Sequence, residues 1–233
     1  MKHSFLILYL LTYILLSCSK SSNSPEFIEQ VTGRYLYNSD EIIEVYFQNE
    51  ELFIKWHGAN KIHPLKLDEQ TFFVKEMNEK VRFLINPDDQ TMYFSLVPKD
   101  KDQPISYNFK KLNNGELTPS EYFKNKDFEK ALQGYLDIQR KDSLDSNIVE
   151  SDFNSKGYSH LRKGHLNEAI QIFKINVALY PDSPNVYDSL GEAFMKSGDT
   201  ISAIDNYKKS LALNSGNKNA KKQLKRLEKK GSD

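Results

Sequence analysis

Two consecutive segments of this chain, residues 150–183 and 184–217, carry matching residue types at equivalent positions, with a constant spacing of 34 in the numbering. The matched pairs are Phe153 and Tyr187, Gly157 and Gly191, Gly164 and Gly198, Ala169 and Ala203, Ile170 and Ile204, and Phe173 and Tyr207. Small residues at fixed offsets between aromatic residues are typical of repeats built from two helices, because helices approach closely only where side chains are small. We therefore expect a helical hairpin in each segment.

This period and its residues resemble the tetratricopeptide repeat. The resemblance rests on Tyr187, Leu190, Gly191, Phe194, Gly198, Ala203 and Tyr207 in the second copy, and on Phe153, Gly157, Gly164, Ala169, Phe173 and Pro181 in the first. It implies a surface that binds other proteins, or a spacer, rather than a catalyst. The basic and amide residues with which some tetratricopeptide domains hold a peptide C-terminus are not reproduced, because Tyr158 and Asp188 break that pattern.

Further helices are expected on both sides of the repeats. Residues 118–121 form a capping box with Pro119 at the first helical position, and residues 127–132 echo 165–170 at a spacing of 38. We interpret 113–149 as a linker and a degenerate repeat. Residues 218–233 predict a basic helix and tail that cap the stack, and an anionic contact such as lipid headgroups is the alternative.

On the first helix of each hairpin, one stripe of residues lies opposite the positions that are expected to pack within the hairpin. By helical spacing this stripe is the candidate partner-binding surface, and a merely solvated face is the alternative. Its residues are Asn154, Tyr158, Leu161 and Arg162 in one repeat, and Asp188, Glu192, Met195 and Lys196 in the next.

The start of the chain has the pattern of a secretory signal peptide, residues 1–17. Lys2 gives a positive charge, and the apolar run at 5–16 is too short to span a bilayer. Cys18, the only cysteine, stands as in a bacterial lipobox, where the cysteine is acylated; Leu16 departs from that motif. The resemblance implies a lipid-anchored protein of the bacterial cell envelope, with 18–25 as a lipidated tether. By the same resemblance, Ser19 favours the outer membrane. An ordinary signal peptide or an uncleaved anchor is the alternative.

Residues 26–112 alternate with a period of two, which predicts antiparallel strands. The runs are expected at 31–37, 42–47, 52–57, 62–67, 71–75, 81–85, 92–97 and 105–109. Short strands at this spacing predict a strongly bent, barrel-like sheet. The expected fold class is therefore α+β in two domains, with an N-terminal antiparallel β-barrel-like domain followed by the helical repeats at 150–183 and 184–217.

The β segment and the repeats together resemble the C-terminal appendages of β-lactamase-related serine hydrolases. The residues that carry this resemblance are 31–35, 51–54, 64–65, 71–73, 81–83 and 178–193. The catalytic domain of that family is missing. Ser-x-x-Lys occurs at Ser17 and at Ser215, but a Lys-Thr-Gly segment does not occur and neither serine has a partner motif. We expect no enzymatic activity and no catalytic residues.

Metal, cofactor and nucleic-acid chemistry are not expected either. The five histidines lack a third ligand at a recognisable spacing, and we interpret His160 and His165 as lying on different faces of a helix. The formal net charge is zero, so the whole chain has no electrostatic preference for nucleic acid. Trp56 is expected to fill the core of the β domain rather than to line a ligand cavity.

The sequence thus predicts a non-catalytic, membrane-anchored lipoprotein that acts as an interaction or scaffold module. The partner is expected to be an envelope protein or peptide. Two alternatives stay open: an accessory subunit of a separately encoded serine hydrolase, and a carrier of a small apolar ligand in the β domain.

Overall fold

The computed structural model describes residues 22–100 and 102–230, so the predicted signal peptide and Cys18 lie outside the described residues. The chain folds into two compact units. Of the described residues, the first unit contains 22–33 and those within 44–107, and the second contains 34–43 and 108–230. Segment 34–43 therefore packs with the helices, whereas the sequence analysis assigns it to the β domain.

The first unit begins with a helix where the sequence analysis expects the end of the tether and the start of the β domain. Helix α1 (Pro25–Val31) starts behind Ser24, whose side chain accepts a hydrogen bond from the backbone N–H of Phe27. Asn23 is buried and donates to the carbonyl of Glu50 at 2.7 Å. The prediction of a tether extending to Pro25 was wrong, because a cap and a buried side-chain hydrogen bond fix this segment to the fold.

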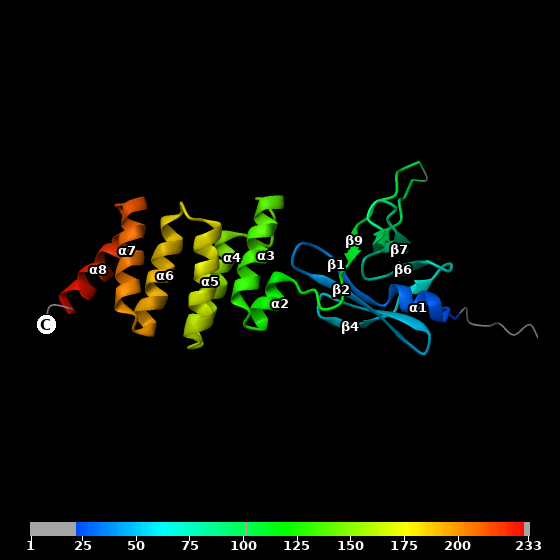
Figure 1. Ribbon diagram of the computed structural model, residues 1–233, viewed down its shortest axis with the longest axis horizontal. Helices are drawn as coiled ribbons and strands as arrows, with labels where there is room; N and C mark the ends of the chain where they lie inside the picture. The colour runs from blue at the N-terminus through cyan, green and yellow to red at the C-terminus, as the bar shows by residue number, and fades with distance from the viewer. Residues whose placement is uncertain (1–21, 101, 231–233) are drawn as a thin grey trace, which may run out of the picture. The chain divides into compact units, whose positions relative to one another are not determined.

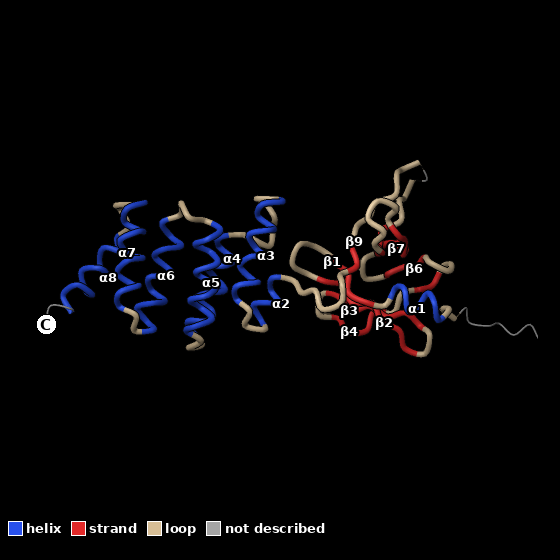
Figure 2. Tube along the Cα trace, in the orientation of Figure 1, coloured by secondary structure: helices blue, strands red, loops and turns tan. Residues whose placement is uncertain are grey.

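The strands of the first unit form antiparallel ladders, as the alternating pattern predicts (Figure 2). Strands β4, β3 and β2 are consecutive neighbours, and β8, β7, β6 and β5 form a second consecutive set. The bounds are β2 (Ile42–Gln48), β3 (Glu51–Trp56), β4 (Ala59–Ile62), β5 (Leu65–Lys66), β6 (Thr71–Val74), β7 (Glu79–Ile85) and β8 (Met92–Leu96). Among the described strands β4 and β5 are the two ends of the order, so the sheet stays open rather than closing into a ring.

Phe27 of α1 makes the central contacts in the core of this unit. Its ring lies 6.2 Å from Phe47, 6.1 Å from Phe72 and 5.7 Å from Phe83. Phe83 in turn lies 4.9 Å from Phe94. Because aromatic rings bury large apolar areas, this cluster stabilises the packing of the short helix α1 against the strands.

The second unit opens with a short pair of strands, β1 (Gly33–Leu36) and β9 (Phe109–Lys111), in which Tyr35 faces Lys111. The residues after β1 are bonded to the first helices. Asp40 accepts from the backbone N–H of Ser120 at 2.7 Å and from the hydroxyl of Tyr135 at 3.0 Å. Segment 34–43 is thus held by buried polar contacts to the helical repeats.

The helices of this unit follow one another in a row of hairpins (Figure 1). They are α2 (Pro119–Lys124), α3 (Phe128–Lys141), α4 (Glu150–Arg162), α5 (Leu166–Leu179), α6 (Pro184–Ser197), α7 (Thr200–Leu213) and α8 (Lys218–Lys230). The predicted capping box at Thr118 is present, and α6 has Ser183 at its N-cap and Pro184 as its first residue. The expectation of two helices in each repeated segment is confirmed by α4–α5 and α6–α7.

The predicted close approach at the repeated glycines is confirmed. A Cβ atom on Gly157 would lie 2.5 Å from the ring of Phe173, and one on Gly191 would lie 3.1 Å from the ring of Tyr207. Each hairpin therefore packs an aromatic ring of its second helix directly on the backbone of its first.

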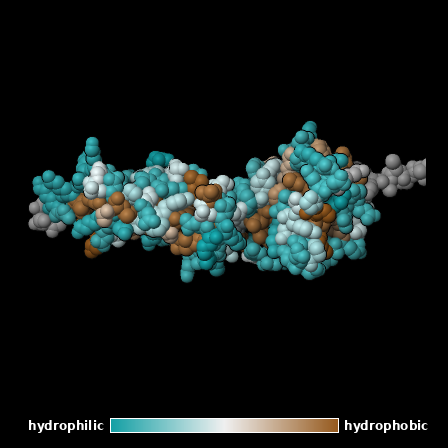
Figure 3. All heavy atoms as spheres, turned by 90° about the horizontal axis from the view of Figure 1, so that it is seen from above, coloured by the Kyte–Doolittle hydropathy of each residue, from teal (hydrophilic) through white to brown (hydrophobic). Residues whose placement is uncertain are grey.

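The described part of the chain contains no helix that is both long and apolar enough to traverse a bilayer. On the face of the helical unit that Figure 3 turns to the viewer, apolar atoms form separate patches within a mainly polar surface.

Candidate functional site

The sequence-predicted stripe lies on α4 and α6, the first helices of the two hairpins, and α8 follows them as the next first helix. Seven of its eight residues are half-buried or exposed, and Leu161 is the exception. Because α4 and α6 occupy equivalent places in consecutive repeats, the two stripes are adjacent copies of one surface.

Hydrogen bonds join these helices into what we call the polar ladder. Its α4–α6 rungs are Ser189 Oγ to Asn154 Oδ1 at 2.7 Å and Tyr158 Oη to Glu192 Oε2 at 3.1 Å. The ladder also includes Glu150 of α4, which accepts from Ser183 Oγ and Asn185 Nδ2, both at 3.1 Å, and Asp188 of α6, which accepts from Asn219 Nδ2 of α8 at 3.0 Å. Four of the eight residues of the predicted stripe, Asn154, Tyr158, Asp188 and Glu192, thus form hydrogen bonds with a neighbouring repeat.

The ladder places acidic groups in a partly desolvated position. Burial raises the pKa of Asp188, the negative charge of Glu192 raises it further, and the hydrogen bond from Asn219 opposes both. Burial also raises the pKa of Tyr158 to about 12, so this hydroxyl stays a donor at neutral pH. Lys196 balances Glu192 through an ion pair at 3.1 Å.

The prediction that Leu161 belongs to an exposed binding stripe was wrong. Its side chain is buried in a cluster with Phe173 of α5 and Leu190 of α6. Leu161 lies four and eight residues beyond Gly157 and Phe153, so it shares the packed side of α4. The equivalent residue Met195 is half-buried against the next cluster. This position therefore packs one repeat on the next.

Arg162 and Lys196 are the exposed members of the predicted stripe. They occupy equivalent positions in the two repeats, one near the end of α4 and the other near the end of α6. Within the predicted stripe, this exposed pair of cations lies beside the mainly half-buried side chains of the polar ladder.

Sequence reasoning missed several ladder residues, namely Glu150, Ser183, Asn185, Ser189 and Asn219. A usable signal exists in the spacing, because the bonded pairs Glu150–Asn185 and Asn154–Ser189 are each 35 residues apart. Aligning one repeat against the next, rather than analysing each helix alone, finds these partners.

The histidines of the repeats lie closer than expected. Helix α4 ends at Arg162, so His165 caps α5 and its ring centroid lies 5.7 Å from that of His160. The prediction of two faces of one helix was wrong, since the chain turns at Gly164 with φ 76°. Burial lowers the pKa of His160, and the positive charges of His165 and Lys163 lower it further. No group of three or more His, Cys, Asp or Glu residues suited to a metal occurs within the described chain.

The β unit has a cleft of about 580 Å³ beside its edge strand β5. Leu52, His63, Leu65 and Phe72 line it, and Ser22 lies at its border. A second cleft of about 370 Å³ lies beside α1. Trp56 lines neither cleft.

The two Ser-x-x-Lys matches gain no support as catalytic motifs. Ser17 lies outside the described residues. Ser215 and Lys218 are both exposed at the turn into α8. A nucleophilic serine needs a base within hydrogen-bond reach in a sheltered site, and this exposed turn does not provide one.

No protein-family model matches this chain. Among curated proteins, heat shock protein STI1 of Saccharomyces cerevisiae is 33% identical over 117 residues, which cover 46% of this chain and 19% of that protein. The chain thus spans about a fifth of the length of this relative. The helical unit itself consists of tetratricopeptide-like hairpin repeats, α4–α5 and α6–α7, with a period of 34 residues.

Solved tetratricopeptide structures also match about half of this chain. The second such domain of human RPAP3, in complex with the HSP70 peptide SGPTIEEVD, is 19% identical and covers 47% of this chain and 88% of that chain, with a TM-score of 0.34. The Arabidopsis OM64 domain is 20% identical and covers 48% of this chain and 88% of that chain, with a TM-score of 0.35.

Proposed function

We propose that this chain is a non-catalytic lipoprotein of the bacterial cell envelope whose tetratricopeptide-type repeats bind another protein. The observation that carries the proposal is the polar ladder, which joins α4, α6 and α8 side by side. Binding is stronger when a surface need not be ordered first, because less conformational entropy is lost on association. The ladder supplies such a preorganised surface.

The charges of this surface indicate the kind of partner. Glu150, Asp188 and Glu192 are its acidic members, and Arg162 and Lys196 lie exposed near the ends of α4 and α6. A peptide that ends in a carboxylate would meet like charge at Asp188. We therefore propose a partner segment that brings hydrogen-bond donors or basic groups to the ladder and an acidic group to Arg162 and Lys196.

The proposed membrane attachment is a lipid on Cys18. Ser22 is the fourth residue after Cys18, so the first described residue lies within about 14 Å of the acylated cysteine in any conformation. Because Asn23 and Ser24 are already bonded into the fold, the anchor would hold the β unit close to the bilayer rather than on a long spacer.

The interaction is tested by affinity capture from detergent-solubilised membranes. The test variant is Arg162→Ala, Lys196→Ala, and the matched control is Lys141→Ala, Lys208→Ala, which removes two exposed cations from the second helices α3 and α7. A partner retained by the wild type and the control but lost from the test variant supports the proposal. Equal recovery in all three, or recovery of no specific protein, overturns the assignment of this surface.

A further inference from the structure

The last described helix, α8, concentrates positive charge in a chain that is neutral as a whole. Residues 218–230 contain seven Lys or Arg and one Glu, a net charge of +6, so the remainder of the chain carries −6. A capping helix needs a polar outer face, but either sign of charge provides one. The large excess of positive charge on this helix therefore requires another explanation.

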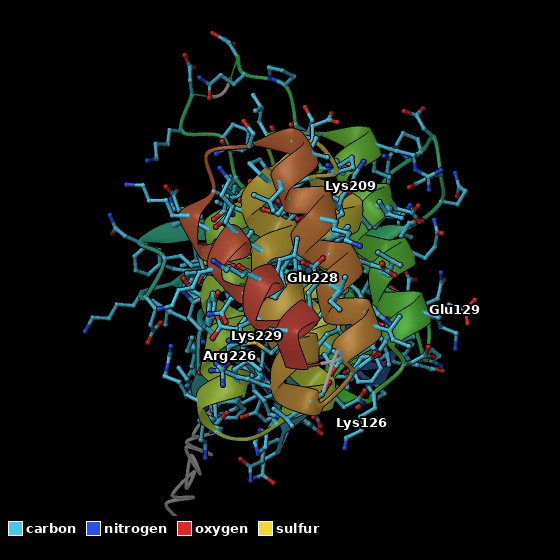
Figure 4. All side chains as sticks on the ribbon, turned by 90° about the vertical axis from the view of Figure 1, so that its left-hand side faces the viewer. Lys126, Glu129, Lys209, Arg226, Glu228 and Lys229 are labelled. Carbon is cyan, nitrogen blue, oxygen red and sulfur yellow. The ribbon has the colours of Figure 1, made fainter. Side chains whose placement is uncertain are left out.

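Helix α8 has two distinct sides. Ala220 and Leu227 are buried and pack with Leu224 against Ala203 and Tyr207 of α7. The cationic side chains are exposed, and they are Lys218, Lys221, Lys222, Lys225, Arg226 and Lys229. Figure 4 shows α8 in front of the other helices, with Arg226 and Lys229 labelled on its open side. The apolar side of α8 thus packs on α7, and its basic side is exposed to solvent.

The arrangement works against the stability of the helix itself. Lys218 and Lys222, Lys221 and Lys225, and Lys225 and Lys229 are like-charged pairs four residues apart, and such pairs destabilise a helix by about 0.2–0.5 kcal/mol each. Within residues 22–100 and 102–230, none of the six exposed cations takes part in an ion pair with an acidic side chain. These six cations are therefore not neutralised by ion pairs within the described part of the chain.

We infer that the exposed face of α8 binds the surface of a bilayer that contains anionic phospholipids. A cluster of four to eight Lys or Arg on one side of an amphipathic helix fits such a surface, because each cation is attracted to the headgroup phosphates. The choice of a bilayer as the occupant rests on the proposed membrane attachment. The helix is held at the bilayer surface by electrostatic attraction and does not insert an apolar face into it, since the apolar side of α8 is already buried on α7.

The test uses a chain that begins at Ser19, which keeps every described residue and lacks the proposed lipid. Its co-sedimentation is measured with phosphatidylcholine vesicles that do or do not contain phosphatidylglycerol. We expect binding only to the anionic vesicles, falling as salt is raised. The variant Lys221→Gln, Lys222→Gln, Lys225→Gln should bind on the order of 100-fold more weakly. The control Lys124→Gln, Lys141→Gln, Lys163→Gln makes the same change in net charge elsewhere and should bind as the wild type does.

A second variant separates binding from folding. Lys222→Glu places opposite charges four residues from both Lys218 and Arg226, so it should stabilise α8 while it weakens vesicle binding. Equal binding by the wild type and the α8 triple variant, or no binding of the wild type to anionic vesicles, overturns the inference. The chain that begins at Ser19 carries no lipid anchor. Neither result therefore bears on the proposed attachment at Cys18, which is tested separately.

Discussion

The hydroxyl of Tyr158 on α4 donates a hydrogen bond to Glu192 on α6, and the two residues are 34 positions apart in the chain. The bond thus joins equivalent surfaces of consecutive repeats. In stacked repeats, stability is approximately the sum of the repeats and the interfaces between neighbours. A bond across this interface contributes to stability and also fixes the surface that we propose to bind a partner.

We expect Tyr158→Phe to lower the free energy of unfolding by about 0.5–1.5 kcal/mol, because a half-buried hydrogen bond is lost while the ring still packs on Phe173. Urea unfolding followed by circular dichroism measures the change. The matched control is Tyr187→Phe, whose hydroxyl donates to the carbonyl of Pro181 within its own stretch of chain and is exposed. A loss for Tyr158→Phe no larger than for the control would show that this rung does not stabilise the repeats.

The two repeated glycines should respond differently to alanine. In Gly157→Ala the new Cβ would meet the buried ring of Phe173 at 2.5 Å, and overpacking of this kind costs about 1–3 kcal/mol. In Gly191→Ala the nearest ring atoms of Tyr207 lie at 3.1 Å, so the helix propensity of alanine, about 1 kcal/mol, offsets most of the strain. Thermal unfolding should show a clearly larger drop in Tm for Gly157→Ala. Equal shifts would contradict the difference in packing.

The helical half follows from sequence because its signals are local and repeated. Glycine, alanine and aromatic positions recur at the same offsets in both repeats, and Pro184 marks the start of α6. The predicted stripe was assigned less well. Leu161 lies four and eight residues beyond Gly157 and Phe153, so helical spacing alone places it on the packed side of α4. The bonds from Ser189 to Asn154 and from Tyr158 to Glu192 join different repeats, and the periodicity of a single helix does not contain them.

In the β unit, the strands could be predicted from the sequence. The packing of Asn23 and helix α1 against those strands could not be predicted. Helix α1 is only 7 residues long, and its sequence has no marked periodicity. It is held by contacts of Phe27 with distant strands and by the bond from Asn23 to Glu50. Likewise, Asp40 joins the helices through Ser120 and Tyr135, which follow it by 80 and 95 residues. Polar contacts at such separations leave no pattern in a single sequence.

Lipid attachment at Cys18 predicts a simple chemical result. The wild type should incorporate a metabolically supplied alkyne fatty acid and partition into the membrane fraction, whereas Cys18→Ala should do neither. Ser17→Ala, which changes the adjacent residue and keeps the thiol, is the control that should behave as the wild type does. Labelling that persists in Cys18→Ala would remove the basis for the proposed anchor.

Asp40 should make stability depend on pH in an unusual direction. Burial raises the pKa of its carboxyl above the ordinary 3.8, and hydrogen bonds from Ser120 and Tyr135 oppose this shift. When the pKa of a group is higher in the folded state than in the unfolded state, folding binds protons, so the stability contributed by that group is fully present below the unfolded value and is lost as pH rises through the folded value. Asp40 therefore favours the folded state in acid.

The comparison of the wild type with Asp40→Asn isolates this effect. The amide keeps one acceptor for the backbone N–H of Ser120 and cannot ionise, and both proteins share the raised pKa of Asp188. As pH falls from neutral towards about 3.8, the wild type should gain free energy of unfolding relative to Asp40→Asn, and the difference should level off below that value. Urea unfolding across this range measures it. A difference that stays constant, or that moves in favour of Asp40→Asn in acid, would show that the folded structure does not favour the protonated carboxyl.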